Sequence, residues 1–151
     1  MQERISQATF YRKCPKIVNH LTALGELSLE SQIEPELVHL IQLRASQLNN
    51  CGFCQHMHAA ELRGGGMSQQ KLDVLPAWRE LGCFSERERA ALEWTEALTL
   101  LTHDFVSDEV FEYVHSIFGE DEILQLTQQI ITINSWNRIS VALRFQPKVE
   151  D

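Results

Sequence analysis

The feature that most constrains this chain is the spacing of its apolar residues, which recur every three or four positions over most of the sequence. This spacing is typical of amphipathic α-helices, whereas a half-buried strand would show alternation at every second residue. Residues that break helices are sparse, since only 7 glycines and 4 prolines occur among 151 residues. We find no convincing strand in the pattern. The sequence therefore predicts an all-α fold.

Length and composition indicate one globular domain over residues 1–151. Hydrophobic residues make up 44% of the chain and charged residues 23%, a balance that excludes collagen-like and disordered classes. The formal net charge is −8, and such an acidic surface repels nucleic-acid phosphates and anionic lipid headgroups. No apolar run approaches the roughly 18 residues of a membrane span, and the first ten residues lack the features of a secretory leader. We expect a cytoplasmic protein with no nucleic-acid or membrane partner.

Helix-capping and helix-breaking residues divide the domain into about seven expected helices. Ser85 and Glu88 form an S-x-x-E capping box, and Ser107 precedes two acidic residues that suit a first helical turn. Pro35 suits the start of another helix, and three glycines at 64–66 end the next one. The main expected helices cover residues 12–27, 36–48, 51–63, 85–102, 107–119 and 120–145, with short helices and turns over 68–78.

Apolar side chains at helical spacing identify the faces that we expect to be buried. In the last helix they wrap around most of the circumference, which implies burial on several sides or in a subunit interface. Trp78, Trp94 and Trp136 are expected to be core or interface anchors, whereas Glu93 and Glu96 are expected to face water. The other predicted faces are Ile17, Leu21, Leu24 and Leu27 in the first helix, and Leu37, Leu40, Ile41 and Leu48 in the second.

The segment CGFCQHMH carries the clearest chemical signal in the chain. On a helix that advances about 100° per residue, Cys51, Cys54 and His58 fall within about 60° of one another. His56 lies about 140° around the helix from Cys51 and is a weaker candidate for the same site. A separation of three residues brings helical Cα atoms to about 5 to 6 Å, within the range that a disulfide accepts. A reversible bridge between Cys51 and Cys54 is therefore geometrically feasible.

In the cytosol, where structural disulfides are rare, such a pair indicates redox chemistry or a metal site. His58 follows Cys54 by four residues, the spacing of neighbouring side chains on a helix, so we expect its imidazole to activate Cys54. A base or a helix N-terminus lowers a thiol pKa from about 8.5 and so favours the reactive thiolate. Attack on a peroxide would leave a sulfenic acid on Cys54, which Cys51 would trap as a disulfide. An external dithiol would then reset the site.

Two other readings of these residues stay open. The cysteines can be small core hydrophobes with His58 as a hydrogen-bonded core histidine. Alternatively, Cys51, Cys54 and His58 can be three zinc ligands, although no second CxxC or HxxxH supplies a clear fourth. The redox interpretation is favoured over both, and it requires no metal and no organic cofactor.

With its CxxCxxxH motif at Cys51, Cys54 and His58, the chain resembles the carboxymuconolactone decarboxylase superfamily, specifically its alkylhydroperoxidase D-like (AhpD-like) branch. The resemblance covers roughly residues 37–145 and includes LRASQLNNC, LPAWRELGCFSERERAALEWTEALT and INSWNRISVALRF. It implies an all-α antioxidant-defence fold that self-associates as a homotrimer or homohexamer. It also implies that the second cysteine meets the hydroperoxide and that the first resolves it.

One position departs from the pattern that the resemblance implies. Peroxidase members carry a glutamate twelve residues before the first cysteine, where it completes a proton relay with the motif histidine, and this chain has His39 there. A neutral imidazole can pass a proton but offers no charge to hold a cation on His58, so we expect weak or altered peroxidase activity. Glu36, one turn earlier, is an alternative relay residue, and His39 can equally be a surface or interface histidine.

The leading hypothesis is a thiol-dependent hydroperoxide reductase in which Cys54 attacks and Cys51 resolves. His58 is the base and proton donor, and His39 is a relay member. The partners would be a hydroperoxide and an external dithiol reductant. The alternative is a non-enzymatic oligomeric redox sensor or binding protein, motivated by the missing relay glutamate. A lactone-acid decarboxylase ranks last, because decarboxylation needs cationic or donor groups around a carboxylate and the motif face is rich in sulfur.

Overall fold

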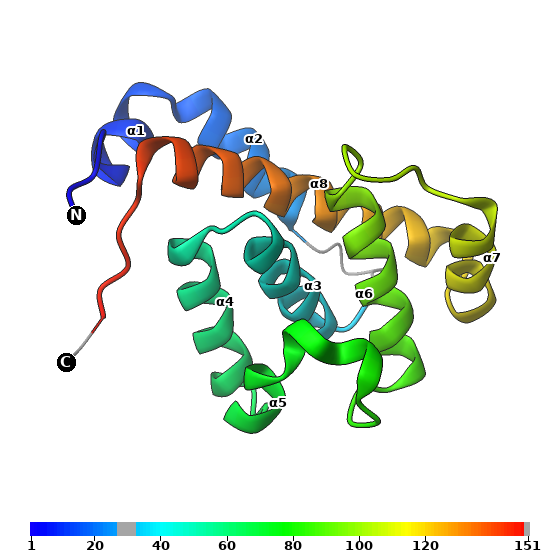
Figure 1. The fold of residues 1–151 in the computed structure, drawn as a ribbon. Helices are drawn as coiled ribbons and strands as arrows, with labels where there is room; N and C mark the ends of the chain where they lie inside the picture. Colours follow the sequence, from blue (N-terminus) through cyan, green and yellow to red (C-terminus); the bar gives the residue numbers. More distant parts are fainter. Residues whose placement is uncertain (27–32, 150–151) are drawn as a thin grey trace.

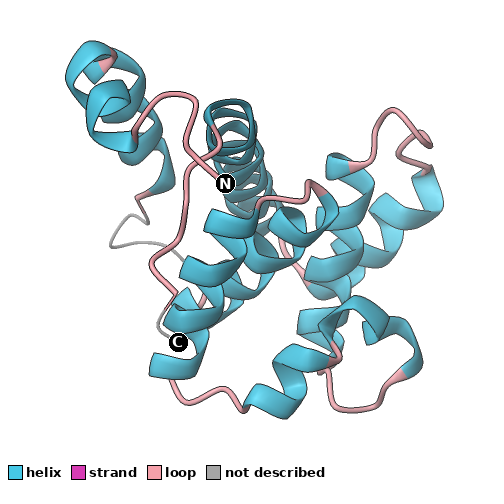
Figure 2. Ribbon diagram, turned by 60° about the vertical axis from the view of Figure 1, so that its left-hand side comes forward, coloured by secondary structure: helices cyan, strands magenta, loops and turns pink. Residues whose placement is uncertain are grey.

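The computed structural model describes residues 1–26 and 33–149, and helices dominate this part of the chain (Figures 1 and 2). The all-α prediction is confirmed, because these residues form eight α-helices and one 3₁₀ helix (η1) and no strand. The predicted starts of α4, α6, α7 and α8 lie within one residue of the observed starts. The elements are α1 (Gln7–Lys13), α2 (Pro15–Gly25), α3 (Pro35–Leu48), α4 (Gly52–Gly64), α5 (Gln69–Asp73), η1 (Leu75–Glu80), α6 (Glu86–Thr99), α7 (Asp108–Ile117) and α8 (Glu120–Leu143).

The helix expected over residues 12–27 is confirmed over α2 (Pro15–Gly25) but is wrong at its start, because residues 12 and 13 end a separate helix, α1. Pro15 has no N–H to donate and disfavours a helical backbone at the preceding residue, which has φ −122° and ψ 48°. The face expected to be buried is largely exposed, with 46% of Ile17 and 39% of Leu24 accessible to solvent. Leu27 lies outside the described residues. α2 packs on α1 and α8 rather than entering the core, so it contains no buried residue.

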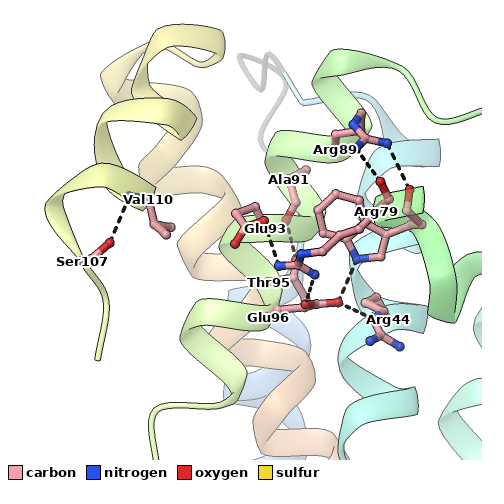
Figure 3. A network of polar contacts seen from close by, with 10 residues as sticks. Arg44, Arg79, Arg89, Ala91, Glu93, Thr95, Glu96, Ser107 and Val110 are labelled. Atoms are coloured by element: carbon pink, nitrogen blue, oxygen red, sulfur yellow. Dashed lines mark hydrogen bonds and ion pairs between the residues drawn. The ribbon is translucent and has the colours of Figure 1, made fainter. Parts of the chain in front are cut away.

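Both serine caps predicted from the sequence are present. Ser85 Oγ accepts from the Glu88 N–H at 3.2 Å, and the Glu88 carboxylate accepts from the Ser85 N–H at 2.7 Å. Ser107 Oγ accepts from the Val110 N–H at 3.3 Å (Figure 3). α6 ends at Thr99, slightly earlier than expected.

The hydrophobic core lies around α3, which packs against α4, α6 and α8. Leu40 and Ile41 are fully buried and Leu37 is nearly so, which confirms most of the face predicted for this helix, while Leu48 is half-buried. Figure 1 shows α8 running across one side of the molecule, with α3, α4 and α6 beneath it. The helix that carries the cysteine motif, α4, is thus held by the core helix α3 and by α8.

The long helix α8 is buried on one face and exposed on the other. Leu126 and Ile130 pack into the core, whereas Leu124 is 62% exposed and Ile131 is 52% exposed. The apolar residues around its circumference are therefore covered on the inner side only, and their proposed place in a subunit interface stays a prediction. Across the described residues, no helix is both long enough and apolar enough to cross a membrane.

Glu96 is the centre of a polar network that joins α3, η1 and α6 (Figure 3). One carboxylate oxygen accepts hydrogen bonds from Arg44 Nε and Trp78 Nε1, both at 2.8 Å, and the other accepts from Arg79. The Glu96 side chain is only 13% exposed, so the expectation that it faces water is wrong. Its donors come from other elements, which a local sequence pattern does not reveal. Trp78 is buried as predicted, and Arg44 has a structural role through its hydrogen bond to Glu96.

Burial raises the pKa of Glu96, but the hydrogen bonds from Trp78, Arg79 and Arg44 more than offset this, so the net pKa lies below its ordinary value of 4.5. A carboxyl group whose pKa is lowered by folding stabilises the fold above its unfolded-state pKa. That contribution is lost as the pH falls through the folded-state value.

Replacing Glu96 with glutamine should lower the free energy of unfolding at pH 7 by about 3 kcal/mol, because Arg44 and Arg79 lose their largely buried counter-charge. Urea unfolding measures the change. The matched control is Glu93→Gln, which breaks a 2.8 Å pair with the 48% exposed Arg79 side chain. This control should cost less than about 1 kcal/mol.

The stability difference between wild type and Glu96→Gln should also narrow as the pH falls below 4.5. The role given to this network would be contradicted if Glu96→Gln and Glu93→Gln lost equal free energy of unfolding at pH 7. It would also be contradicted if the stability difference between wild type and Glu96→Gln did not change with pH.

Candidate active site

A tight reversal between α3 and α4 places Cys51 at the start of α4. Asn50 has φ 54°, in the left-handed region that asparagine adopts more readily than most residues, and it follows Asn49, the C-cap of α3. The Cys51 N–H then donates to the carbonyl oxygen of Ser46 at 2.9 Å. The reversal therefore anchors Cys51 against the last turn of α3.

Asn137 of α8 holds this reversal from the side, a role that sequence reasoning missed. Its side chain is fully buried. Its Nδ2 donates to Ser46 Oγ at 2.9 Å, and its Oδ1 accepts from Asn49 Nδ2 at 3.0 Å. The only sequence signal was the WNR segment of the family resemblance, because the partners of Asn137 are 88 and 91 residues away. Arg138 is exposed and donates to Asn134 within α8.

Cys51 and Cys54 are joined by a disulfide with a Cα–Cα distance of 5.3 Å, in agreement with the spacing expected for a helix. Both residues are 2% exposed. Cys51 is the N-cap of α4, and the Cys54 N–H donates to its sulfur at 3.3 Å. Backbone N–H groups at a helix N-terminus favour negative charge, so this position favours the thiolate of the reduced pair.

The two bonded cysteines line different pockets. Cys54 and His58 line a pocket of about 310 Å³, so the structure brings these two predicted residues to one cavity. Cys51 lines a second pocket of about 260 Å³, together with residues 144–147 of the C-terminal segment. The walls of the larger pocket are mainly apolar and include Phe53, Met57, Ile133, Trp136 and Phe145.

Glu61 supplies a carboxylate beside His58 that the sequence analysis did not select. Its Oε2 lies 2.7 Å from His58 Nδ1, in a hydrogen bond between residues one helical turn apart. His39 Nδ1 lies 2.9 Å from the same oxygen, and the centroids of the two imidazole rings are 6.0 Å apart. Glu36 is exposed and lines a separate pocket. His39 therefore joins this group and Glu36 does not. The sequence signal that could have identified Glu61 was its spacing of three residues from His58 on one helix.

The hydrogen bond from His58 lowers the pKa of Glu61, burial raises it, and the charges on His58 and His39 lower it again, so the net pKa lies below its ordinary value of 4.5. Glu61 is thus an ionised acceptor, and we assign the His58 hydrogen to Nδ1 from this bond. Nε2 of His58 is buried and has no hydrogen-bond partner within the described residues. In this tautomer the basic lone pair of a neutral His58 lies on Nε2.

A model of the carboxymuconolactone decarboxylase family matches residues 15–97, which is more than half of the chain and includes the CxxCxxxH motif. The chain belongs to this family. The resemblance seen in the sequence is thereby confirmed. This family member is also similar to the uncharacterized protein YdfG of Bacillus subtilis, with 35% identity over 143 residues that cover 95% of each chain.

Solved structures share the fold. A protein of unknown function from Agrobacterium tumefaciens, named as a candidate antioxidant defence protein AhpD, has 37% identity and a TM-score of 0.90 and covers 99% of this chain and 100% of its own. An uncharacterized peroxidase-related protein from a Silicibacter species has 23% identity and a TM-score of 0.80, with coverage of 93% and 75%. The debrominase Bmp8 has 18% identity and a TM-score of 0.79, with coverage of 91% and 74%. The last two show the fold alone.

Replacing Asn137 with alanine should lower the free energy of unfolding by about 1 to 3 kcal/mol, because it removes buried hydrogen bonds to Ser46 and Asn49. It should also slow closure of the disulfide between Cys51 and Cys54 after reduction, because the reversal before Cys51 loosens. Urea unfolding and a timed thiol quench measure the two effects. Arg138 is the exposed neighbour of Asn137, and Arg138→Ala should change the free energy of unfolding and the rate of disulfide closure only slightly. Equal behaviour of the two variants would contradict this role for Asn137.

Proposed function

We propose that the protein is a thiol-dependent hydroperoxide reductase of the AhpD-like type. One observation carries the proposal: the disulfide-bonded Cys54 shares a pocket with His58, and Nδ1 of His58 is hydrogen-bonded to Glu61. These are the groups that a cysteine nucleophile needs, namely a base in the same pocket as the thiol and a third group that orients the base.

In the reduced enzyme, His58 Nε2 accepts the proton of the Cys54 thiol. The resulting thiolate attacks the terminal oxygen of a hydroperoxide, forming an S–O bond as the O–O bond breaks. The departing alkoxide takes the proton from His58 and leaves as an alcohol, so Cys54 is oxidised to a sulfenic acid. The unpartnered, buried Nε2 supports this role, because it is the nitrogen left available once Nδ1 is engaged.

Cys51 then resolves the intermediate. Its thiolate attacks the sulfur of the Cys54 sulfenic acid, the S–S bond forms, and the oxygen leaves as water after protonation. An external dithiol returns the pair to two thiols and is itself oxidised to a disulfide, which supplies the two electrons and two protons of the cycle. The 5.3 Å Cα–Cα distance supports this step, since it lies within the range that a disulfide accepts.

Glu61 takes the part that the resemblance assigns to a glutamate at position 39. Its ionised carboxylate holds the hydrogen of His58 on Nδ1 and stabilises the imidazolium that forms when Cys54 is deprotonated. Although position 39 holds histidine in place of glutamate, Glu61 still supplies a carboxylate to the relay. We therefore propose a competent reductase rather than an inert redox sensor. A lactone-acid decarboxylase is disfavoured, because no Lys or Arg occurs among the described residues that line the larger pocket.

The physiological setting stays part of the proposal. A cytoplasmic location and a homotrimer or homohexamer are implied by the resemblance and the composition. The exposed apolar residues Leu124, Ile131 and Val141 on the outer face of α8 support self-association.

Cys54→Ser should abolish turnover of tert-butyl hydroperoxide with dithiothreitol, because the attacking sulfur is gone. Cys51→Ser should still react once, and its Cys54 should gain one oxygen atom in mass spectrometry. Cys83→Ser, which removes a free and exposed cysteine, is the matched control and should keep wild-type turnover. Equal turnover in wild type and both motif variants would defeat the proposed mechanism.

Glu61→Gln should lower kcat on the order of 10²-fold with little change in KM, because His58 loses the anion that orients it and stabilises its charged form. The assay uses protein treated with a chelator. Glu36→Gln is the matched control, since Glu36 is an exposed acid that lines another pocket, and it should leave kcat unchanged. A Glu61→Gln enzyme with the kcat of wild type would remove Glu61 from the relay.

A further inference from the structure

Glu61, His39 and His58 form a cluster of metal-ligating groups. One ligand atom from each residue lies within 4.8 Å of the other two. Glu61 Oε2 is the common neighbour, at 2.7 Å from His58 Nδ1 and 2.9 Å from His39 Nδ1. The groups come from α3 and α4, which pack directly against each other, so the two helices fix the convergence.

The hydrogen bonds of this cluster are incomplete. His58 Nδ1 donates to Glu61. In contrast, His39 Nδ1 is buried and has no hydrogen-bond partner within the described part of the chain, despite its short contact with the same carboxylate oxygen. A buried polar atom left without a partner costs free energy. A cation between the three atoms would pair all of them at once.

The spacing of the cluster fits a divalent transition-metal ion. Zinc binds imidazole nitrogen and carboxylate oxygen at about 2.0 to 2.2 Å, so neighbouring ligand atoms lie about 2.9 Å apart at right angles and about 3.4 Å apart at tetrahedral angles. The two contacts to Glu61, at 2.7 and 2.9 Å, fall at or just below this range. Small rotations of the Glu61 side chain, which is 40% exposed, are enough to open the space.

The ligand chemistry of the cluster and its access to solvent also favour a divalent transition-metal ion. Two neutral imidazoles and one carboxylate suit zinc and neighbouring first-row ions, and their single negative charge is complementary to a dication. The side chains of Glu61 and His39 are 40% and 34% exposed, which gives an ion and its water ligands a route from solvent. His58 is 6% exposed and provides the fixed inner ligand.

We propose that His39, His58 and Glu61 form a binding site for a divalent transition-metal ion of the zinc type, with water in its remaining coordination positions. The site uses no cysteine, unlike the zinc alternative considered from the sequence. It therefore exists while Cys51 and Cys54 are joined in a disulfide.

Metal binding and reductase chemistry exclude each other, a consequence that rests on the proposed function. A metal ion on Nδ1 keeps the hydrogen of a neutral imidazole on Nε2. His58 then cannot accept the proton of the Cys54 thiol. Position 39 is decisive, because a histidine there adds the second nitrogen ligand.

Zinc titration of the oxidised protein by isothermal calorimetry tests the site. Cys14→Ser and Cys83→Ser are introduced in every sample and the disulfide is kept closed, so that no thiol can bind zinc. We expect one zinc ion per chain in the otherwise unchanged protein. The Kd for zinc should rise at least about 10-fold in His39→Gln and in Glu61→Gln. Even the loss of a residue that only supports a metal ligand typically weakens metal affinity by this factor.

His56→Gln is the matched control, because His56 is an exposed histidine on the same helix and should leave the Kd unchanged. Circular dichroism verifies folding, and at equal zinc concentration the rise in Tm should be similar in the parent and in His56→Gln and smaller in His39→Gln. The proposal is overturned if the parent binds no zinc, or if His39→Gln and Glu61→Gln bind it as tightly as the parent. No peroxide or reductant is present, so this result and the reductase assay succeed or fail independently.

Discussion

The chain reversal between α3 and α4 is the constraint on which the candidate site depends. Asn50 takes the left-handed conformation, the Cys51 N–H returns to Ser46, and the buried Asn137 fixes the turn from α8. Cys51 thereby caps α4, and the remaining motif residues follow at intervals of three and four along one face of that helix. One backbone event therefore sets the positions of two sulfurs, an imidazole and a carboxylate, while α3 brings the second histidine to the same face.

The sequence was sufficient where the physical cause lies within a few residues. The all-α class, the serine caps and the spacing of the cysteine pair all rest on local periodicity and local hydrogen bonds. One failure comes from a proline that the prediction passed over, since Pro15 separates residues 12–14 from the helix that follows. Distance along the chain explains others: Glu96 is buried because donors from α3 and η1 reach it, and the partners of Asn137 lie on another helix. Glu61 was within reach of a helical wheel, but an acid near the end of a helix is ordinarily solvated.

Histidine at position 39 adds a second imidazole to the site, and Glu61 still provides a carboxylate there. The ionised oxygen of Glu61 lies between two imidazole nitrogens, and only one of these donates a hydrogen bond to it. The same three atoms can therefore share protons or a metal ion, and the choice between them decides which nitrogen of His58 is free. The two proposals therefore couple redox chemistry at the sulfurs with metal binding at the imidazoles through one residue, His58.

The disulfide also joins two residues that line different cavities. Phe53, Ser140 and Phe145 belong to the walls of both, yet Cys54 lines only the larger cavity and Cys51 only the smaller one. In the proposed mechanism, the hydroperoxide would meet Cys54 in the larger cavity and the external dithiol would meet Cys51 in the smaller one. Arg144, Gln146 and Pro147 line the smaller cavity and not the larger one. Substitutions at these three positions would therefore alter the surroundings of Cys51 and leave the lining of the Cys54 cavity unchanged.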